Sequence, residues 1–252
     1  PRQVTVSVAI SNRFSLEAME EFYEGIHLAC KRYNVDLVGG DTTSSLKGFV
    51  ISVTAIGEAV ENKIAYRNNA KPGDLLCVTG ELGGAYLGLQ ILEREKRIYL
   101  ESPGVQPDLG KQNYVIGRQL KPEARADIIK TFEEIDIVPT AMIDVSDGLS
   151  SDLMHICKSS NVGALVQEQN VPIHEETFNL ALEFQLDPIT CALNGGEDYE
   201  LLFTIKPEDR EKLRGEWDFS IIGEIVPKDD GVKIHTKGGN YHDLLAQGWK
   251  SF

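Results

Sequence analysis

The chain has 252 residues, of which 42% are hydrophobic and 25% are charged, as in an ordinary globular protein of one or two domains. Acidic residues outnumber basic ones by 39 to 25, and the net charge of -14 disfavours binding to nucleic acid or to anionic membranes. No apolar run approaches the roughly 20 residues that cross a bilayer, and four scattered cysteines argue against a zinc site and favour a reducing cytoplasm.

The first sixty residues predict a strand, a helix and two further strands. Residues 3–10 alternate between apolar and polar types, which is typical of a half-buried strand. Ser15 is then expected to cap a helix that has acidic first turns and one apolar face. A short strand at 36–38 should end at a turn over residues 39–43, and a strand rich in β-branched residues follows at 49–56.

The rest of the chain predicts helices and strands that intermix without strict β-α-β regularity. The expected strands are 75–79, 142–145, 162–167, 200–205, 220–226 and, as the last one, 232–235. Helices are expected after Gly84, from Pro122 to 132, and at 148–158, 175–184 and 208–214, whereas 101–118 is expected to be irregular. The pattern indicates an α+β fold with mixed α/β layers. We place the boundary between two units near residues 58–72, with domains at 1–60 and 61–252.

The segment Gly39-Gly40-Asp41-Thr42-Thr43 is the first with candidate chemistry. Two glycines would let backbone amides approach an anion closely. Asp41, with hydroxyls beside it, could hold a hard cation such as Mg²⁺. The alternative is a tight turn with a capping aspartate.

The second segment runs from Ile143 to Asp152, where a strand passes into a helix. Asp144 and Asp147 lie three residues apart across that junction and could share Mg²⁺, while Ser146 and the helix N-terminus could meet a phosphate oxygen. A helix cap formed by Ser146 or Asp147 would account for one acid, but not for an apolar strand that also ends in Asp144.

The third segment is Gly195-Gly196-Glu197-Asp198-Tyr199-Glu200, at the entry to an apolar strand. Its acids could orient a cationic ligand or a metal, and a solvated turn is the alternative. Two single residues add to it. Arg67, near the expected boundary, could meet a phosphate, and Trp249 could stack on a flat ring or act as a hydrophobic anchor.

Several familiar signatures are missing from the sequence. It has no G-x-x-x-x-G-K-[ST] loop, no protein-kinase motif set, no G-x-G-x-x-G and no arguable Ser-His-Asp arrangement. Acids for metal and glycine-rich segments for phosphate remain. That combination suits phosphoryl transfer by positioning and charge neutralisation.

The order of the motifs is more specific than any one of them. G-G-D-T-T, K-P-G-D, I-D-V-S-D-G-L, G-G-E-D-Y-E-L and a terminal Gly-Trp follow one another along the chain. In this order the chain resembles the thiamine-monophosphate kinases, in the aminoimidazole-ribonucleotide-synthetase superfamily, over essentially its whole length. The resemblance implies a two-domain synthetase-like fold. It also implies direct, in-line phosphorylation of thiamine monophosphate to thiamine diphosphate by ATP and Mg²⁺, without a covalent nucleophile on the enzyme.

The resemblance also implies roles for individual residues. Those expected to contact ATP are Gly40, Asp41, Arg67 and Ser146. Those expected to bind Mg²⁺ are Asp41, Asp144 and Asp147. Glu197 and Trp249 are expected to bind the thiamine portion of the substrate, and a carboxylate and an aromatic face both suit a thiazolium cation.

Members of the family carry a further segment before the position of Pro1, with a G-D-D turn and more aspartates. The chain opens at Pro1 and its first methionine is Met19, so we expect a fragment in which the N-terminal domain is only partly present. The family dimerises through N-terminal domains that form a shared barrel, which implies a homodimer for the full-length protein and little or no kinase activity for this chain alone. The alternatives are another ATP-using enzyme of the superfamily and a non-catalytic thiamine-phosphate-binding module.

Overall fold

A computed structural model describes residues 1–107, 109–110, 112–213, 215 and 218–246. The chain forms two compact units, Pro1–Ile64 and Ala65–Phe252, each with its own sheet. The prediction of a mixed α/β fold is confirmed, because both sheets carry helices. Within the described residues, no helix has both the length and the apolar composition of a membrane span.

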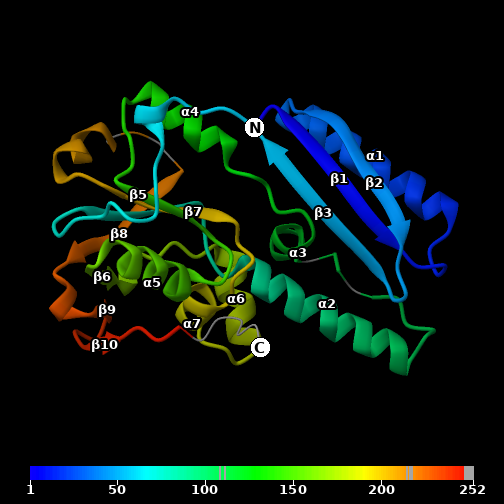
Figure 1. The fold of residues 1–252 in the computed structure, drawn as a ribbon. Coiled ribbons are helices and arrows are strands. Elements are labelled where there is room, and N and C mark those ends of the chain that lie inside the picture. The colour runs from blue at the N-terminus through cyan, green and yellow to red at the C-terminus, as the bar shows by residue number, and fades with distance from the viewer. Residues whose placement is uncertain (108, 111, 214, 216–217, 247–252) are drawn as a thin grey trace. The chain divides into compact units, whose positions relative to one another are not determined.

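The N-terminal unit is a three-stranded sheet with one long helix (Figure 1). Its elements are β1 (Gln3–Ile10), α1 (Leu16–Tyr33), β2 (Asp36–Ser44), β3 (Phe49–Ile56) and a 3₁₀ turn at Glu61–Lys63. The strand order is β2-β1-β3, with β1 parallel to β2 and antiparallel to β3. Ser15 caps α1 as predicted, because its hydroxyl accepts the N–H of Ala18 at 3.3 Å. The ring of Phe22 in α1 packs against that of Phe49 in β3, with centroids 4.9 Å apart.

The prediction of a turn at residues 39–43 is wrong, because β2 continues through them to Ser44. Gly40 pairs with Val6 of the parallel strand β1. A Cβ atom at Gly40 would overlap the carbonyl oxygen of Val6, so a side chain there would push the two strands apart. The glycine therefore serves close strand pairing rather than a turn.

The C-terminal unit is built on a seven-stranded sheet with strand order β10-β9-β6-β8-β4-β7-β5 (Figure 1). Its strands are β4 (Leu75–Thr79), β5 (Ala141–Val145), β6 (Gly163–Gln167), β7 (Glu200–Ile205), β8 (Phe219–Val226), β9 (Val232–His235) and β10 (Tyr241–Asp243). Neighbours are antiparallel except for the parallel pair β6 and β9. Its helices are α2 (Gly84–Glu101), α3 (Asn113–Leu120), α4 (Ala126–Glu134), α5 (Leu149–Ser160), α6 (Glu175–Glu183) and α7 (Pro188–Asn194), with 3₁₀ segments at Glu168–Asn170, Pro207–Leu213 and Lys228–Asp230.

Helices cover both faces of this sheet, so its strands alternate between two hydrophobic cores (Figure 1). In β4, Leu76 and Val78 point toward α5, while Cys77 between them points toward α4. Burial raises the pKa of the Cys77 thiol to about 12, so this group acts as a small apolar side chain.

Some elements differ from the prediction. Residues 101–118 contain most of α3, and α4 begins at Ala126 rather than at Pro122. The chain before α4 is instead drawn toward the sheet, because Arg125 forms an ion pair with the buried Glu200. Residues 207–213 form a 3₁₀ helix, and β9 is followed by a further strand, β10.

Helix α7 was also missed, although its start is marked in the sequence. The carboxylate of Asp187 accepts the N–H of Thr190 at 3.2 Å, and Pro188 occupies the first turn. An acidic cap followed by proline is a regular helix start.

Candidate functional site

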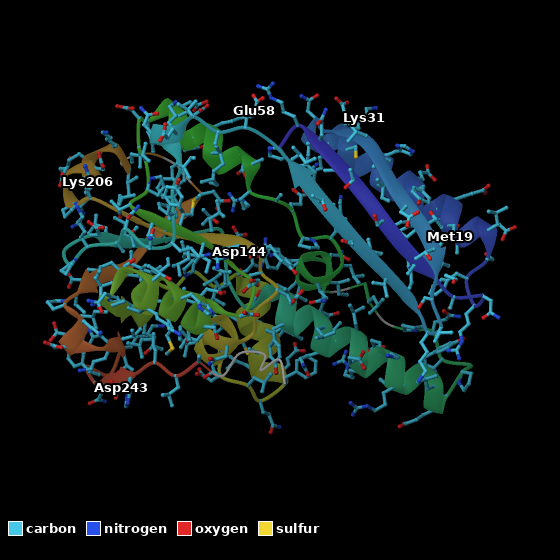
Figure 2. All side chains as sticks on the ribbon, in the orientation of Figure 1. Met19, Lys31, Glu58, Asp144, Lys206 and Asp243 are labelled. Carbon is cyan, nitrogen blue, oxygen red and sulfur yellow. The ribbon has the colours of Figure 1, made fainter. Side chains whose placement is uncertain are left out.

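The loop between β5 and α5 carries three of the predicted site residues. Asp144 lies in β5 (Figure 2), and Ser146 and Asp147 follow before α5 begins. The alternative of a cap by Ser146 or Asp147 is wrong, because Gly148 stands at the cap position with φ 98° and makes no side-chain cap. The carboxylate of Asp152 folds back instead and accepts the N–H groups of Ser146 and Asp147 at 3.0 and 3.1 Å.

Asp152 therefore holds the loop, and the carboxylates of Asp147 and Asp144 lie near enough to act on its charge. Burial is the largest cause that raises its pKa to about 6, and the charges of Asp147 and Asp144 act in the same direction. The two backbone N–H groups oppose the shift. Asp147 itself is exposed, and the side chain of Asp144 is half-exposed. The loop thus presents two carboxylates to solvent in a field that favours a cation.

Arg67 lies beside the same loop. Its guanidinium is 4.0 Å from the carboxylate of Asp144. The segment is fixed along the edge strand, because Tyr66 accepts the N–H of Met142 in β5 at 3.0 Å and the carbonyl of Arg67 accepts the hydroxyl of Ser160 in α5. The structure therefore brings a predicted phosphate ligand next to a predicted metal ligand.

The loop from Gly195 to Tyr199 interlocks with the β5–α5 loop. Glu197 donates its N–H to the carbonyl of Ser146, and Tyr199 donates its N–H to the carbonyl of Val145, both at 2.8 Å. Gly196 has φ 69°, and a Cβ atom there would lie 2.6 Å from the carbonyl oxygen of Ser146. Glycine at this position lets the two loops approach closely.

The acids of this loop divide into buried and exposed ones. Asp198 is 2% exposed, and its carboxylate accepts the N–H groups of Gly83 and Ala85, at the start of α2, at 2.8 and 3.4 Å. Burial is the largest cause that raises the pKa of Asp198 to about 7. The alternative of a solvated turn is therefore wrong for this acid, which anchors the loop to a helix N-terminus.

Glu200 is likewise buried, with 1% exposure. Its carboxylate accepts the hydroxyl of Thr79 at 2.5 Å and pairs with Arg118 at 2.8 Å and with Arg125 at 2.5 Å. Arg118 also donates to the carbonyl oxygen of Asp198 at 2.7 Å. Two guanidinium groups thus compensate a buried carboxylate and fix the start of β7.

Glu197 and Tyr199 point outward from the same loop. Glu197 is exposed and Tyr199 is 38% exposed, and the Tyr199 hydroxyl donates to the Glu197 carboxylate at 3.1 Å. Burial, this hydrogen bond and the charges of Glu197, Asp144 and Asp147 raise the pKa of Tyr199. Sequence reasoning missed Tyr199. Its place inside the glycine-rich acidic motif was the available signal.

In the N-terminal unit, a hollow of about 500 Å³ contains the predicted residues Gly40 and Asp41. The other residues that line it are Val6, Tyr23, Leu37, Val38, Gly39 and Thr42. The hydroxyl oxygens of Tyr23 and Thr42 lie 3.5 Å apart across it. Tyr23 was not predicted, and no local motif marks it.

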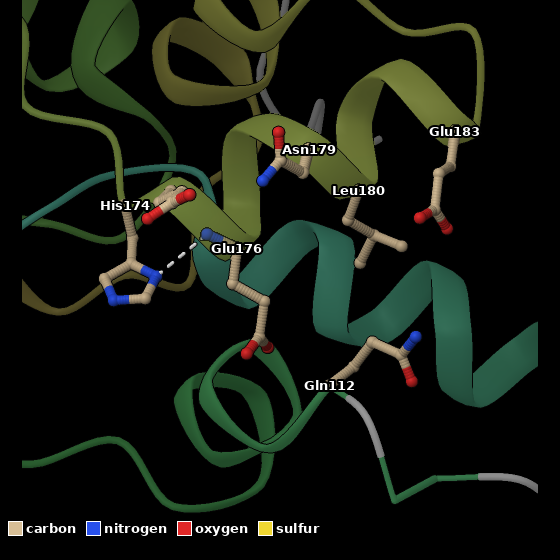
Figure 3. A pocket seen from close by; sticks show the side chains of 7 residues that line it. Gln112, His174, Glu176, Asn179, Leu180 and Glu183 are labelled. Carbon is tan, nitrogen blue, oxygen red and sulfur yellow. Dashed lines mark hydrogen bonds between the residues drawn. The ribbon is translucent and has the colours of Figure 1, made fainter.

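A second hollow, of about 400 Å³, lies between α6 and the start of α3 (Figure 3). Its polar groups serve the helix starts. The ring of His174 accepts the N–H of Glu176, and the Glu176 carboxylate accepts the N–H of Val115, each at 3.1 Å. None of the predicted site residues lines it.

Carboxylate oxygens are the ligands that Mg²⁺ prefers, and a protein site with few of them leaves room for water and phosphate oxygens. Asp144 and Asp147 fit that chemistry, and so does Asp41 in the N-terminal unit. Over the described part of the chain, no three His, Cys, Asp or Glu side chains form a ready ligand set. The predicted residue Trp249 lies outside the described residues.

The chain is similar in sequence to known proteins. The N-terminal domain model of AIR synthase related proteins matches residues 1–59, and the C-terminal domain model matches residues 71–235. Thiamine-monophosphate kinase from Bacillus subtilis (strain 168) is 34% identical over 216 residues, which are 86% of this chain and 62% of that protein. The one from Pyrococcus horikoshii is 32% identical over 253 residues, 94% of this chain and 74% of that protein.

A solved structure described as AaThiL complexed with AMPPCP and TMP is also similar. It superposes with a TM-score of 0.79 at 28% identity and covers 100% of this chain and 74% of that one. The chain therefore spans 62% to 74% of the length of these relatives.

Proposed function

The chain belongs to the thiamine-monophosphate kinase family of AIR synthase related proteins, and we propose on that premise that it serves the ATP-dependent phosphorylation of thiamine monophosphate to thiamine diphosphate. The observation that carries the proposal is the interlocking of the β5–α5 loop with the loop of Glu197. Through it, the loop with two carboxylates suited to Mg²⁺ lies against the loop with a carboxylate suited to a cationic ring. A kinase that acts on a cationic phosphate ester needs a site for Mg²⁺ and a site for the cationic ring.

In the proposed reaction, a phosphate oxygen of thiamine monophosphate attacks the γ-phosphorus of ATP in line. The new phosphorus–oxygen bond forms as the bond to the β-phosphate oxygen breaks, and ADP leaves with that electron pair. Bound Mg²⁺ would neutralise charge on the phosphates. No side chain becomes covalently modified, so the protein acts by holding the two phosphates together.

Each predicted residue has a part in that scheme. Asp144 and Asp147 would hold Mg²⁺, and Ser146 would donate its hydroxyl to a phosphate oxygen. Arg67 would exchange its exposed pair with Asp144 for the more highly charged phosphates of ATP. Glu197 would bind the thiazolium ring by charge. Trp249 would add an aromatic face.

For the N-terminal unit, we propose that Gly40 and Asp41 contact ATP and that Asp41 also binds Mg²⁺. Both line the hollow in that unit, and Asp41 is exposed. The unit would also carry the contacts of a homodimer. The chain offers few carboxylates suited to several Mg²⁺ ions, Asp144 and Asp147 in one unit and Asp41 in the other, so we propose that it binds its ligands but has little or no kinase activity.

Calorimetric titration with thiamine monophosphate, with and without MgAMPPCP, tests the proposal directly. We expect the chain to bind thiamine monophosphate, and chromatography of an ATP-containing reaction to show little or no formation of thiamine diphosphate. Binding of thiamine monophosphate without any binding of MgAMPPCP would favour the non-catalytic module. Binding of MgAMPPCP without thiamine monophosphate would favour another ATP-using enzyme of the superfamily and would overturn the proposed substrate.

A further inference from the structure

The loop that carries Glu197 is held in an unusual backbone conformation. Glu197 and Tyr199 have φ values of 62° and 52°, in the left-handed region that residues other than glycine rarely adopt. Strain of this kind gathers at functional sites and persists only where the surroundings enforce it. Two residues of one short loop share it here, so the conformation has a purpose beyond chain reversal.

The surroundings that enforce it are visible on both sides of the loop. Inward, the carboxylate of Asp198 is fixed by the N–H groups of Gly83 and Ala85. Toward β5, the N–H groups of Glu197 and Tyr199 bond to the carbonyls of Ser146 and Val145. The middle residue is thereby pulled into the unit, and the side chains on either side of it turn outward together.

The two outward side chains meet each other. The hydroxyl of Tyr199 donates to Oε2 of Glu197 at 3.1 Å. The pKa of Tyr199 is raised, chiefly by burial, so the phenol keeps its proton at neutral pH and remains a donor. A flexible exposed glutamate would otherwise sample several rotamers, and this bond selects one of them.

We infer that Tyr199 is a positioning residue whose hydroxyl holds the carboxylate of Glu197 in place for a cationic heteroaromatic ring. This rests on the proposed function, and it adds a second determinant of specificity to the site. The fixed carboxylate attracts a delocalised positive charge, and among the described residues no hydrogen bond is formed to its second oxygen, Oε1. The partly exposed ring of Tyr199 offers an aromatic face, which also attracts a cation.

The test compares the 252-residue chain with its Tyr199→Phe variant, which loses only the hydroxyl. Calorimetry should show about tenfold weaker binding of thiamine monophosphate, the loss expected for one hydrogen bond to a charged group. A neutral analogue, in which a thiophene replaces the thiazolium ring, should bind the two proteins equally. The melting temperature should not change. Tyr241→Phe is the matched control, because Tyr241 lies in β10 at the opposite end of the sheet from β5 and should leave binding unaltered.

A double-mutant cycle separates positioning from a general effect. If Tyr199 acts through Glu197, then Glu197→Gln and the double variant should bind thiamine monophosphate with equal affinity. Unaltered binding by Tyr199→Phe overturns the inference, and so does an equal loss for the neutral analogue or a full loss in the Glu197→Gln background. In each of these results the unaltered chain still binds, so the proposed function stands. If the unaltered chain does not bind thiamine monophosphate, both are overturned.

Discussion

The guanidinium of Arg67 lies 4.0 Å from the carboxylate of Asp144, and both side chains remain open to solvent. An exposed pair at this distance contributes at most about 1 kcal/mol to folding, because water screens it. It is readily exchanged for a stronger partner. ATP phosphates and Mg²⁺ would be stronger partners for the arginine and the aspartate respectively, so we propose that ligand replaces this internal contact.

Replacing Arg67 with alanine should therefore weaken MgAMPPCP binding about tenfold or more, while the free energy of unfolding changes by less than about 1 kcal/mol. Calorimetry and urea denaturation measure the two quantities. Arg2→Ala is a matched control, since Arg2 forms a similarly exposed pair with Glu58 at 3.1 Å in the N-terminal unit. Equal nucleotide affinity for the Arg67 variant and the control would show that Arg67 does not contact the phosphates.

Asp147→Asn should abolish the part of nucleotide binding that depends on Mg²⁺ and leave the melting temperature unaltered. The side chain of Asp147 is exposed, so its carboxylate is not needed for packing, whereas an amide oxygen is a much weaker ligand for a hard cation. Titration with AMPPCP in Mg²⁺ and in chelator measures the difference. Asp229→Asn, on the exposed 3₁₀ turn after β8, serves as control. A Mg²⁺ effect that survives in Asp147→Asn would rule out this ligand.

Asp198 should make the stability of the C-terminal unit depend on pH. Its pKa is raised from 3.8 to about 7, chiefly by burial, so the folded state binds a proton that the unfolded state releases. The stability from this group is therefore greatest near pH 4 and falls as pH rises toward 7. In urea titrations, we expect the unfolding free energy of the unaltered chain to fall relative to that of Asp198→Asn as pH rises across that window. A constant difference would mean that Asp198 is ionised throughout.

Gly40→Ala should disrupt the pairing of β1 with β2, because the added Cβ would overlap the carbonyl of Val6. Its neighbour offers an exact comparison, since a Cβ at Gly39 would meet nothing within 4 Å. Hydrogen exchange should speed up in both strands for Gly40→Ala and stay slow for Gly39→Ala. Equal exchange in the two variants would show that the strands can shift to accept the methyl group.

The sequence was sufficient for several local features. Alternation predicted β1, a serine before an amphipathic segment predicted the cap of α1, and ordered motifs predicted the family. It failed where the role of a residue depends on how the backbone folds around it. Gly40 is small because of Val6, and Asp152 holds the loop before α5 by accepting the N–H groups of Ser146 and Asp147. Tyr199 escaped notice because its partner is defined only by the folded backbone of its own loop.

Burial alternates residue by residue from Gly196 to Glu200, so the motif has one set of side chains that contact the protein and another that faces solvent. Of the inward side chains, Asp198 binds the start of α2 and Glu200 pairs with two arginines. The outward side chains, Glu197 and Tyr199, face solvent and are open to a ligand. A substitution at an outward position can therefore change what the loop binds without disturbing the contacts that hold it. A relative that keeps only the inward acids has retained this loop's architecture, and its chemistry must be judged from the other two positions.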